Sequence, residues 1–234
     1  MNRTFRLTFA TLATLLLLAP TLQAEEEPSL ATVEGQEDLE KVRRAAFRET
    51  YVNTAADWTK YDKLYLGEAH YDYRDVGPAE RYRTSRSMRS TNSLFGISEE
   101  DRRKFEEITG EAFDKQIIKG KNFTITEEID DTTLYLRGGV VDIISRVPPE
   151  YVGRAEVYLA SVGEATLIME FLDGTTGEVL ARVAERGVIG SNRGGLDSFS
   201  MPSNRVTVTA DVRRWASNAA SRLRRELDDA IAGK

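Results

Sequence analysis

Apolar and polar residues alternate over much of the chain, and this pattern predicts more strands than helices. Residues 165–172 and 178–184 alternate on either side of a five-residue connection with two glycines, 173–177, which predicts a β-hairpin. The large apolar residues from Leu167 to Phe171, taken at every second position, share one face, which should point to the core. Further strands are predicted at residues 47–52, 61–69, 123–125 and 133–144.

Two longer segments show the period of amphipathic helices. The first opens with a cap signal, because Ser98 precedes three acidic residues, which the dipole at a helix N-terminus favours, and it stops at Gly120. The second begins near Thr209 and has a charged outer face. The stripes expected to face the core are Phe105, Ile108, Ala112 and Gln116, with Phe113 and Ile117 beside them, and Val212, Trp215, Ala219, Leu223, Leu227 and Ile231.

The order of these elements predicts one α+β domain over residues 46–232. Strands, a helix, several further strands and a final helix follow one another without a repeating βαβ unit, which argues against a doubly wound fold. We therefore expect a mixed, largely antiparallel sheet of about five strands with two helices packed on one face. The pair Gly138 and Gly139 inside the strand at 133–144 indicates a bulge or bend.

The N-terminus has the layout of a secretory signal peptide. Arg3 and Arg6 precede an uncharged run of about 13 residues, and Ala24 supplies a small residue at the expected cleavage point. The run is short for a membrane-spanning helix, which needs roughly 20 residues. Residues 1–24 are thus predicted to be removed, leaving a periplasmic or secreted protein. Residues 25–45 then form a flexible or partly helical lead-in.

Composition narrows the chemistry that the chain can perform. It has 234 residues, no cysteine and one histidine, so disulfides, thiolate nucleophiles, zinc–thiolate sites and a lipid anchor on cysteine are excluded, and most catalytic triads with them. The net charge is −6, and it becomes more negative when the two leader arginines are lost. Such an acidic chain is not a general nucleic-acid binder. No cofactor or metal is expected.

A long polar loop over residues 72–96 contains the strongest candidate for a binding site. Arg81, Tyr82, Arg83, Arg86 and Arg89 form a basic cluster in an otherwise acidic protein. Guanidinium groups there would bind phosphates of lipopolysaccharide or anionic lipid, carboxylates of peptidoglycan, or an acidic envelope protein. The alternative is a solvated loop without a ligand. A second loop, rich in glycine, serine and asparagine, covers residues 189–204.

A second candidate site lies where the strand at 61–69 ends. Glu68, His70 and Asp72 alternate, so on a continuing strand they would project from one face and could hold a metal or perform acid–base chemistry. The alternative is a solvated strand end. Tyr65, Tyr71 and Tyr73 could instead form a recognition surface. The stretch 173–178 superficially matches phosphate-handling sequences, but turn chemistry explains its residues.

Several stretches together resemble one known family. They are 51–64, 136–142, 163–181 and 212–216, and the likeness extends from about residue 46 to residue 229. In their order along the chain they resemble the bacterial envelope family catalogued as domain of unknown function three-three-one-three. This resemblance implies an exported domain of mixed helices and strands, and it supplies no catalytic residue. The chain lacks the acylated cysteine of that family's lipoproteins.

Three functions follow from these observations. The first is an exported, non-enzymatic binding module of the cell envelope that recruits another chain along a sheet edge, with the arginine cluster adding charge complementarity. The second is a small metal-dependent or acid–base hydrolase that uses Glu68, His70 and Asp72. The third is a carrier of an apolar ligand, which requires a cavity between sheet and helices.

Overall fold

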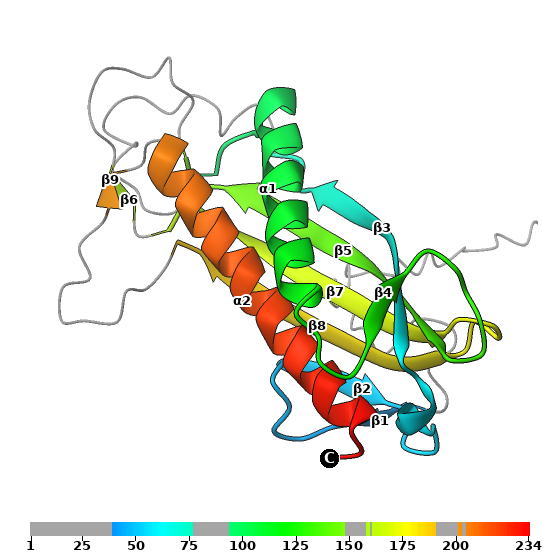
Figure 1. Cartoon of the computed structure of the whole chain (residues 1–234). Coiled ribbons are helices and arrows are strands. Elements are labelled where there is room, and N and C mark those ends of the chain that lie inside the picture. The colour runs from blue at the N-terminus through cyan, green and yellow to red at the C-terminus, as the bar shows by residue number, and fades with distance from the viewer. Residues whose placement is uncertain (1–38, 77–93, 148–157, 160, 191–200, 203–204) are drawn as a thin grey trace, which may run out of the picture. The chain divides into compact units, whose positions relative to one another are not determined.

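A seven-stranded mixed sheet forms the centre of the described residues in this computed structural model (Figure 1). The structure describes residues 39–76, 94–147, 158–159, 161–190, 201–202 and 205–234. The strands are β1 (Glu40–Lys41), β2 (Glu49–Val52), β3 (Lys63–Tyr73), β4 (Thr124–Thr126), β5 (Thr133–Ser145), β7 (Gly163–Asp173) and β8 (Val179–Ile189). A separate antiparallel pair consists of β6 (Tyr158–Leu159) and β9 (Met201–Pro202).

The order of strands in the sheet is β1-β2-β8-β7-β5-β3-β4. β3 is parallel to both β4 and β5, and the remaining pairs are antiparallel. The predicted α+β class with a mixed, largely antiparallel sheet is therefore confirmed, but the expected number of strands, about five, is too low. β1 lies within residues 25–45, which were expected to be flexible or partly helical. Its two residues are too few to show a period, and it forms only because β2 pairs with it.

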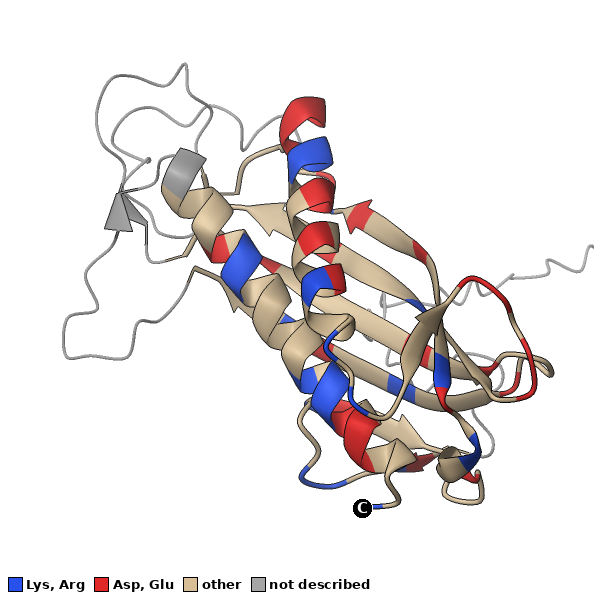
Figure 2. Cartoon of the chain, viewed as in Figure 1, with Lys and Arg blue, Asp and Glu red and all other residues tan. Residues whose placement is uncertain are grey.

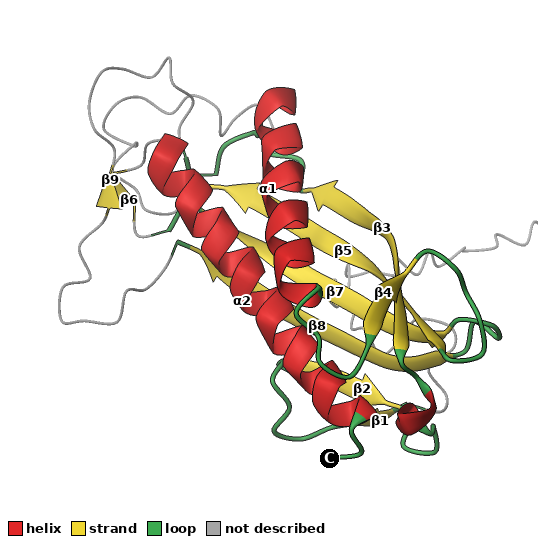
Figure 3. Cartoon of the chain, viewed as in Figure 1, coloured by secondary structure: helices red, strands yellow, loops and turns green. Residues whose placement is uncertain are grey.

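Two helices cover one face of this sheet (Figure 3). They are α1 (Glu99–Ile117) and α2 (Arg205–Ile231), and a short 3-10 turn covers Trp58–Lys60. Ser98 caps α1 as predicted, because its hydroxyl accepts a hydrogen bond from the Asp101 amide at 3.2 Å. α2 begins at Arg205, slightly before the predicted start. Figure 2 shows charged residues on the outer surfaces of both helices. No helix within the described ranges is long and apolar enough to cross a membrane.

The core lies between this sheet face and the two helices. Leu167, Met169 and Phe171 of β7 are 5–7% exposed, which confirms the face predicted from their alternation. From α2, Leu223 and Leu227 are buried in the same cluster. Each such side chain contributes roughly 1.5–3 kcal/mol when it is fully buried. The apolar face of β7 and the apolar stripe of α2 therefore pack into one core, as the alternation in the strand and the period of the helix predict.

The glycine pair in β5 lies beside an irregular pairing with β3, but the bulge there is in β3, not in the strand of the glycines as predicted. The register of β3 against β5 shifts between Leu66 and Ala69, so β3 contains one additional residue there. A Cβ atom added to Gly139 would lie 1.9 Å from the His70 carbonyl oxygen. Only glycine allows the two backbones to approach this closely. The bulge changes the face toward which the following residues of β3 point.

The β7–β8 hairpin is also confirmed. Its turn is held by Asp173, whose Oδ1 accepts from the Thr175 amide at 3.0 Å and the Thr176 amide at 2.9 Å. These local bonds are those of an aspartate turn, so turn chemistry accounts for this stretch. In α2, Asp228 accepts from the amides of Lys121 and Asn122 and so fixes the turn that follows α1.

Candidate functional site

The arginine cluster predicted at Arg81, Tyr82, Arg83, Arg86 and Arg89 lies outside the described residues. Most of the predicted loop at 189–204 lies outside them as well. At its start, Ile189 belongs to β8, and the loop at 72–96 likewise begins inside β3, which extends to Tyr73. The binding hypothesis for the arginine cluster therefore stays a prediction.

Glu68, His70 and Asp72 all lie in β3, which continues past them, and all three are exposed. The register shift between Leu66 and Ala69 lies beside Glu68, and His70 and Asp72 follow it at alternate positions of β3. Among the described residues, no group of three or more His, Asp or Glu side chains is placed to hold a metal ion. The use of these three residues in chemistry stays a prediction.

The expectation of a common surface formed by Tyr65, Tyr71 and Tyr73 is wrong. The rings of Tyr71 and Tyr73 each lie edge-on to Phe105 of α1, with centroids 6.3 Å apart, so both pack under the helix. Tyr65 instead contacts Tyr135, with ring centroids 5.5 Å apart. On a regular strand these three even-spaced tyrosines would share a face, and the bulge places Tyr65 on the opposite one.

The outer edge of β3 is the first candidate binding feature. β4 pairs with β3 only from Lys63 to Tyr65. From Leu66 to Tyr73, no other described strand pairs with β3 on the side away from β5. Along this stretch, which we call the β3 edge, alternate backbone N–H and C=O groups point away from β5 and have no strand partner among the described residues.

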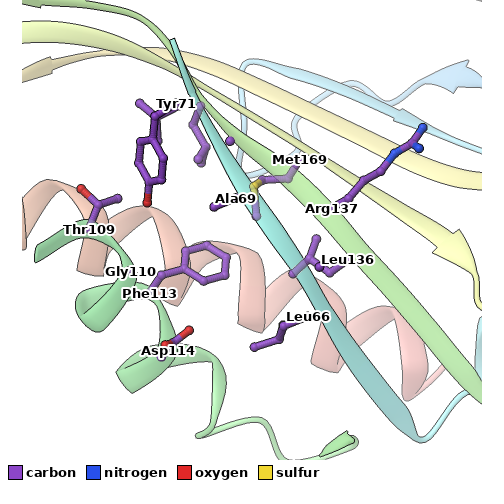
Figure 4. Close-up of a pocket in the computed structure, with 15 residues that line it drawn as sticks. Leu66, Ala69, Tyr71, Thr109, Gly110, Phe113, Asp114, Leu136, Arg137 and Met169 are labelled. Carbon is purple, nitrogen blue, oxygen red and sulfur yellow. The ribbon is translucent and has the colours of Figure 1, made fainter. Parts of the chain in front are cut away.

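A small cavity between α1 and the sheet is the second candidate (Figure 4). Its volume is about 100 Å³. Leu66, Leu136 and Met169 line it from the sheet, and Phe113 lines it from the helix. Figure 4 places Asp114 beside Phe113 and Tyr71 on the opposite wall. A carrier of an apolar ligand requires a cavity at this position, between the two layers.

Polar groups of α1 border this cavity. The Thr109 hydroxyl is buried and has no hydrogen-bond partner in the described part of the chain. Burial raises the pKa of the Asp114 carboxyl above its ordinary value. Burial also raises the pKa of Tyr71, and the negative charges of Glu106 and Asp114 add to this effect. The cavity is thus apolar inside, with the Asp114 carboxyl at its rim, and the guanidinium of Arg137, which also lines it, is paired with Glu170.

A buried polar cluster joins the 3-10 turn to the β7–β8 hairpin. Asp173 Oδ2 accepts from Lys60 Nζ and from the Tyr61 hydroxyl, both at 2.8 Å. Burial alone would raise the pKa of Asp173, but these bonds and those from Thr175 and Thr176 outweigh it and hold that pKa well below its usual range. Burial raises the pKa of Tyr61 to about 12. These bonds join the 3-10 turn to the hairpin, so the cluster is a structural anchor.

On the sheet face opposite the helices, arginines and carboxylates alternate across the strands. Glu170 accepts from Arg182 Nε at 2.5 Å and from Arg137 Nε at 2.7 Å. Glu164 contacts Arg146 and also accepts from Arg186 at 3.1 Å. This network connects β5, β7 and β8. Arg182 is only 2% exposed, and its ion pair with Glu170 offsets the cost of burying its charge. The signal of this network in the sequence is the pair of acids at Glu164 and Glu170, which alternate with the apolar core residues.

No family model matches the chain, and no curated protein matches it. Similar solved structures include the PelC dodecamer from Paraburkholderia phytofirmans, at 10% identity and a TM-score of 0.32, over 74% of this chain and 96% of that chain. A DUF330 protein from Xanthomonas campestris is 12% identical with a TM-score of 0.34, over 79% and 90% of the two chains. A homologue of the neuraminyllactose-binding hemagglutinin from Helicobacter pylori is 11% identical with a TM-score of 0.30, over 74% and 84%.

At these identities and TM-scores the likeness assigns no function to this chain. The family suggested by the sequence motifs therefore also stays a prediction.

Proposed function

We propose that this protein is an exported, non-enzymatic binding module of a bacterial cell envelope, and that it pairs an extended segment of a partner with the β3 edge. The observation that carries this proposal is the stretch from Leu66 to Tyr73, which pairs with β5 on one side and with no described strand on the other. An extended peptide can join such an edge through main-chain hydrogen bonds, while side chains provide specificity.

The side chains along the β3 edge favour a basic partner. Glu68 and Asp72 are exposed and acidic, and His70 lies between them. Opposite charges on neighbouring strands contribute about 0.2–1 kcal/mol per pair, and like charges oppose pairing. Two copies of this edge would therefore repel each other, and the bulge further disfavours regular pairing between copies. A partner strand with lysine or arginine at alternate positions fits this edge better.

The arginine cluster would extend the same binding surface. The cluster from Arg81 to Arg89 follows β3 within a few residues along the chain. The same partner could therefore contact both the β3 edge and the cluster. Acidic side chains of the same partner outside its basic strand, or an anionic envelope component, would bind these guanidinium groups. The proposal thus combines main-chain pairing on the strand with charge contacts in the segment that follows it.

A crosslinking experiment tests the strand proposal. A photoreactive residue at Glu68 or Asp72, in protein expressed in bacterial cells, should crosslink to the same partner. The same residue at Thr175, on the exposed hairpin turn, is the matched control and should not. The variant with Glu68→Lys and Asp72→Lys should lose the crosslink from a probe at Gly96, an exposed position outside β3. Identical products from all positions, or none from the edge, would contradict the proposal.

Two further measurements test the remaining parts. The mass of the purified protein and its fractionation report export, and the expected result is a periplasmic or secreted chain that begins after Ala24. An unprocessed chain inside the cell contradicts export. The variant with alanine at Arg81, Arg83, Arg86 and Arg89 should capture less anionic envelope material than the parent protein, and equal capture removes the cluster from the binding surface.

A further inference from the structure

The middle of α1 contains a glycine that packing does not require. Gly110 borders the cavity between α1 and the sheet, and a Cβ atom added there would meet no atom within 4 Å outside its own helix. Gly139, in contrast, is fixed by close backbone contact. Glycine is among the poorest helix formers, so its presence in a helix interior without a steric reason is unusual. At Gly110 it leaves space beside the cavity.

The apolar lining of the cavity selects an apolar body for any ligand. Leu66, Phe113, Leu136 and Met169 provide carbon and sulfur surfaces from both layers. An engineered apolar cavity of about 150 Å³ holds a benzene molecule. The cavity here, at about 100 Å³, accommodates a smaller group, of roughly four or five carbon atoms.

The rim of the cavity selects a positive charge. Asp114 lines the cavity from its exposed side, and among the described residues its carboxylate has no hydrogen-bond or ion-pair partner. The charges of Glu106 and Asp114 both raise the pKa of the Tyr71 hydroxyl, which also lines the cavity. A carboxylate beside an apolar cavity attracts a cation whose body can enter that cavity.

We propose that this cavity binds a small primary alkylammonium ion, with its hydrocarbon chain between Phe113 and Met169 and its ammonium group at Asp114. The ammonium group donates to the Asp114 carboxylate, while the chain covers apolar surface that water contacts poorly. Gly110 keeps the entrance beside Asp114 open. This inference is independent of strand pairing at the β3 edge, so either proposal can fail without the other.

Calorimetric titration of the full-length protein with n-butylammonium chloride tests this proposal. Saturable binding with a dissociation constant in the millimolar range is expected from a ligand of five heavy atoms, and butan-1-ol and sodium butyrate should bind at least ten-fold more weakly. Asp114→Asn should weaken n-butylammonium binding about ten-fold. Glu107→Gln is the matched control, because Glu107 lies two turns away on the same helix and does not line the cavity. It should bind as the parent protein does.

The Gly110→Leu variant tests the role of the cavity, because it fills the space and leaves the charge of Asp114 unchanged. The leucine side chain should occupy the space beside Gly110 and abolish saturable binding, while thermal stability is unchanged or increased because a helix-interior glycine is replaced. Equal binding of butan-1-ol and n-butylammonium, unchanged binding in Gly110→Leu or Asp114→Asn, or an equal loss in Glu107→Gln would each overturn the proposal. Absence of saturable binding by the parent protein would do the same.

Discussion

Replacing Asp173 with alanine should cost more stability than replacing any exposed aspartate of the domain. Its carboxylate is nearly buried and is shared by Lys60, Tyr61 and two residues of the hairpin turn. The Tyr61 hydroxyl loses its acceptor in Asp173→Ala, and Tyr61 is only 1% exposed, so water cannot easily replace it. The substitution thus loosens the turn and leaves a buried donor unsatisfied.

The expected magnitude follows from the environment of each partner. An unsatisfied buried hydroxyl costs about 1–3 kcal/mol, and each lost turn bond about 0.5–1.5 kcal/mol before water compensates. Lys60 adds less than about 1 kcal/mol, because its side chain is 46% exposed and stays hydrated. We expect a total loss of about 3 kcal/mol in the free energy of unfolding. With a urea slope of about 2 kcal/mol per molar, the midpoint falls by about 1.5 M.

Equilibrium unfolding in urea at pH 7 measures this loss, and Asp57→Ala is the matched control. Asp57 also accepts from a backbone amide and a threonine hydroxyl, both of Thr59, but it is exposed and holds no buried phenol. It should cost about 1 kcal/mol. Tyr61→Phe in a double-mutant cycle with Asp173→Ala should give a coupling energy of at least about 1 kcal/mol. Equal costs for Asp173→Ala and Asp57→Ala, or simple additivity in the cycle, would refute this reasoning.

Three other predictions concern the loss of stability at acidic pH, the close backbone contact at Gly139, and the role of His70. Because the folded-state pKa of Asp173 lies below its unfolded value of about 3.9, its stabilisation is present above that pH and is lost as the pH falls through and below about 4. The stability gap between the parent protein and Asp173→Asn should therefore shrink between pH 5 and pH 3 in urea titrations, and a constant gap contradicts the assignment. Gly139→Ala should destabilise by about 2–3 kcal/mol in urea because its Cβ would meet the His70 carbonyl, whereas Gly177→Ala, which faces open space at a φ of 73°, should cost about 1 kcal/mol. His70→Ala should leave both the unfolding midpoint and partner crosslinking unchanged, while loss of a hydrolytic activity or of metal uptake in that variant would favour the alternative enzyme hypothesis.

Periodic segments made much of this fold predictable from the sequence. The alternation in β7 gives the core face directly, and Ser98 followed by acidic residues marks the start of α1 where the structure has it. The stripe on α2 also identifies its buried residues. These features depend on residues close in sequence, so local spacing contains the necessary information.

Features that depend on distant contacts were not predictable in this way. The glycine pair indicates a bulge, but the sequence does not show that the bulge reverses Tyr65 relative to Tyr71. The contact between Tyr61 and Asp173 joins residues 112 positions apart, and neither residue type identifies the other. The cavity likewise arises from α1 and β5 meeting in space. Candidate chemistry inferred from one strand alone therefore missed the sites formed between elements.

The connectivity of the sheet also has a consequence for how the chain folds. The β7–β8 hairpin forms from neighbouring residues, so its register can be established early. β2 reaches β8, and β3 reaches β5, only after long stretches of chain have been ordered. Amide protons in β7 and the inner part of β8 should thus exchange most slowly with deuterium, while β1 and β4 should exchange first. A nascent chain held by a chaperone would expose β3 until β5 arrives.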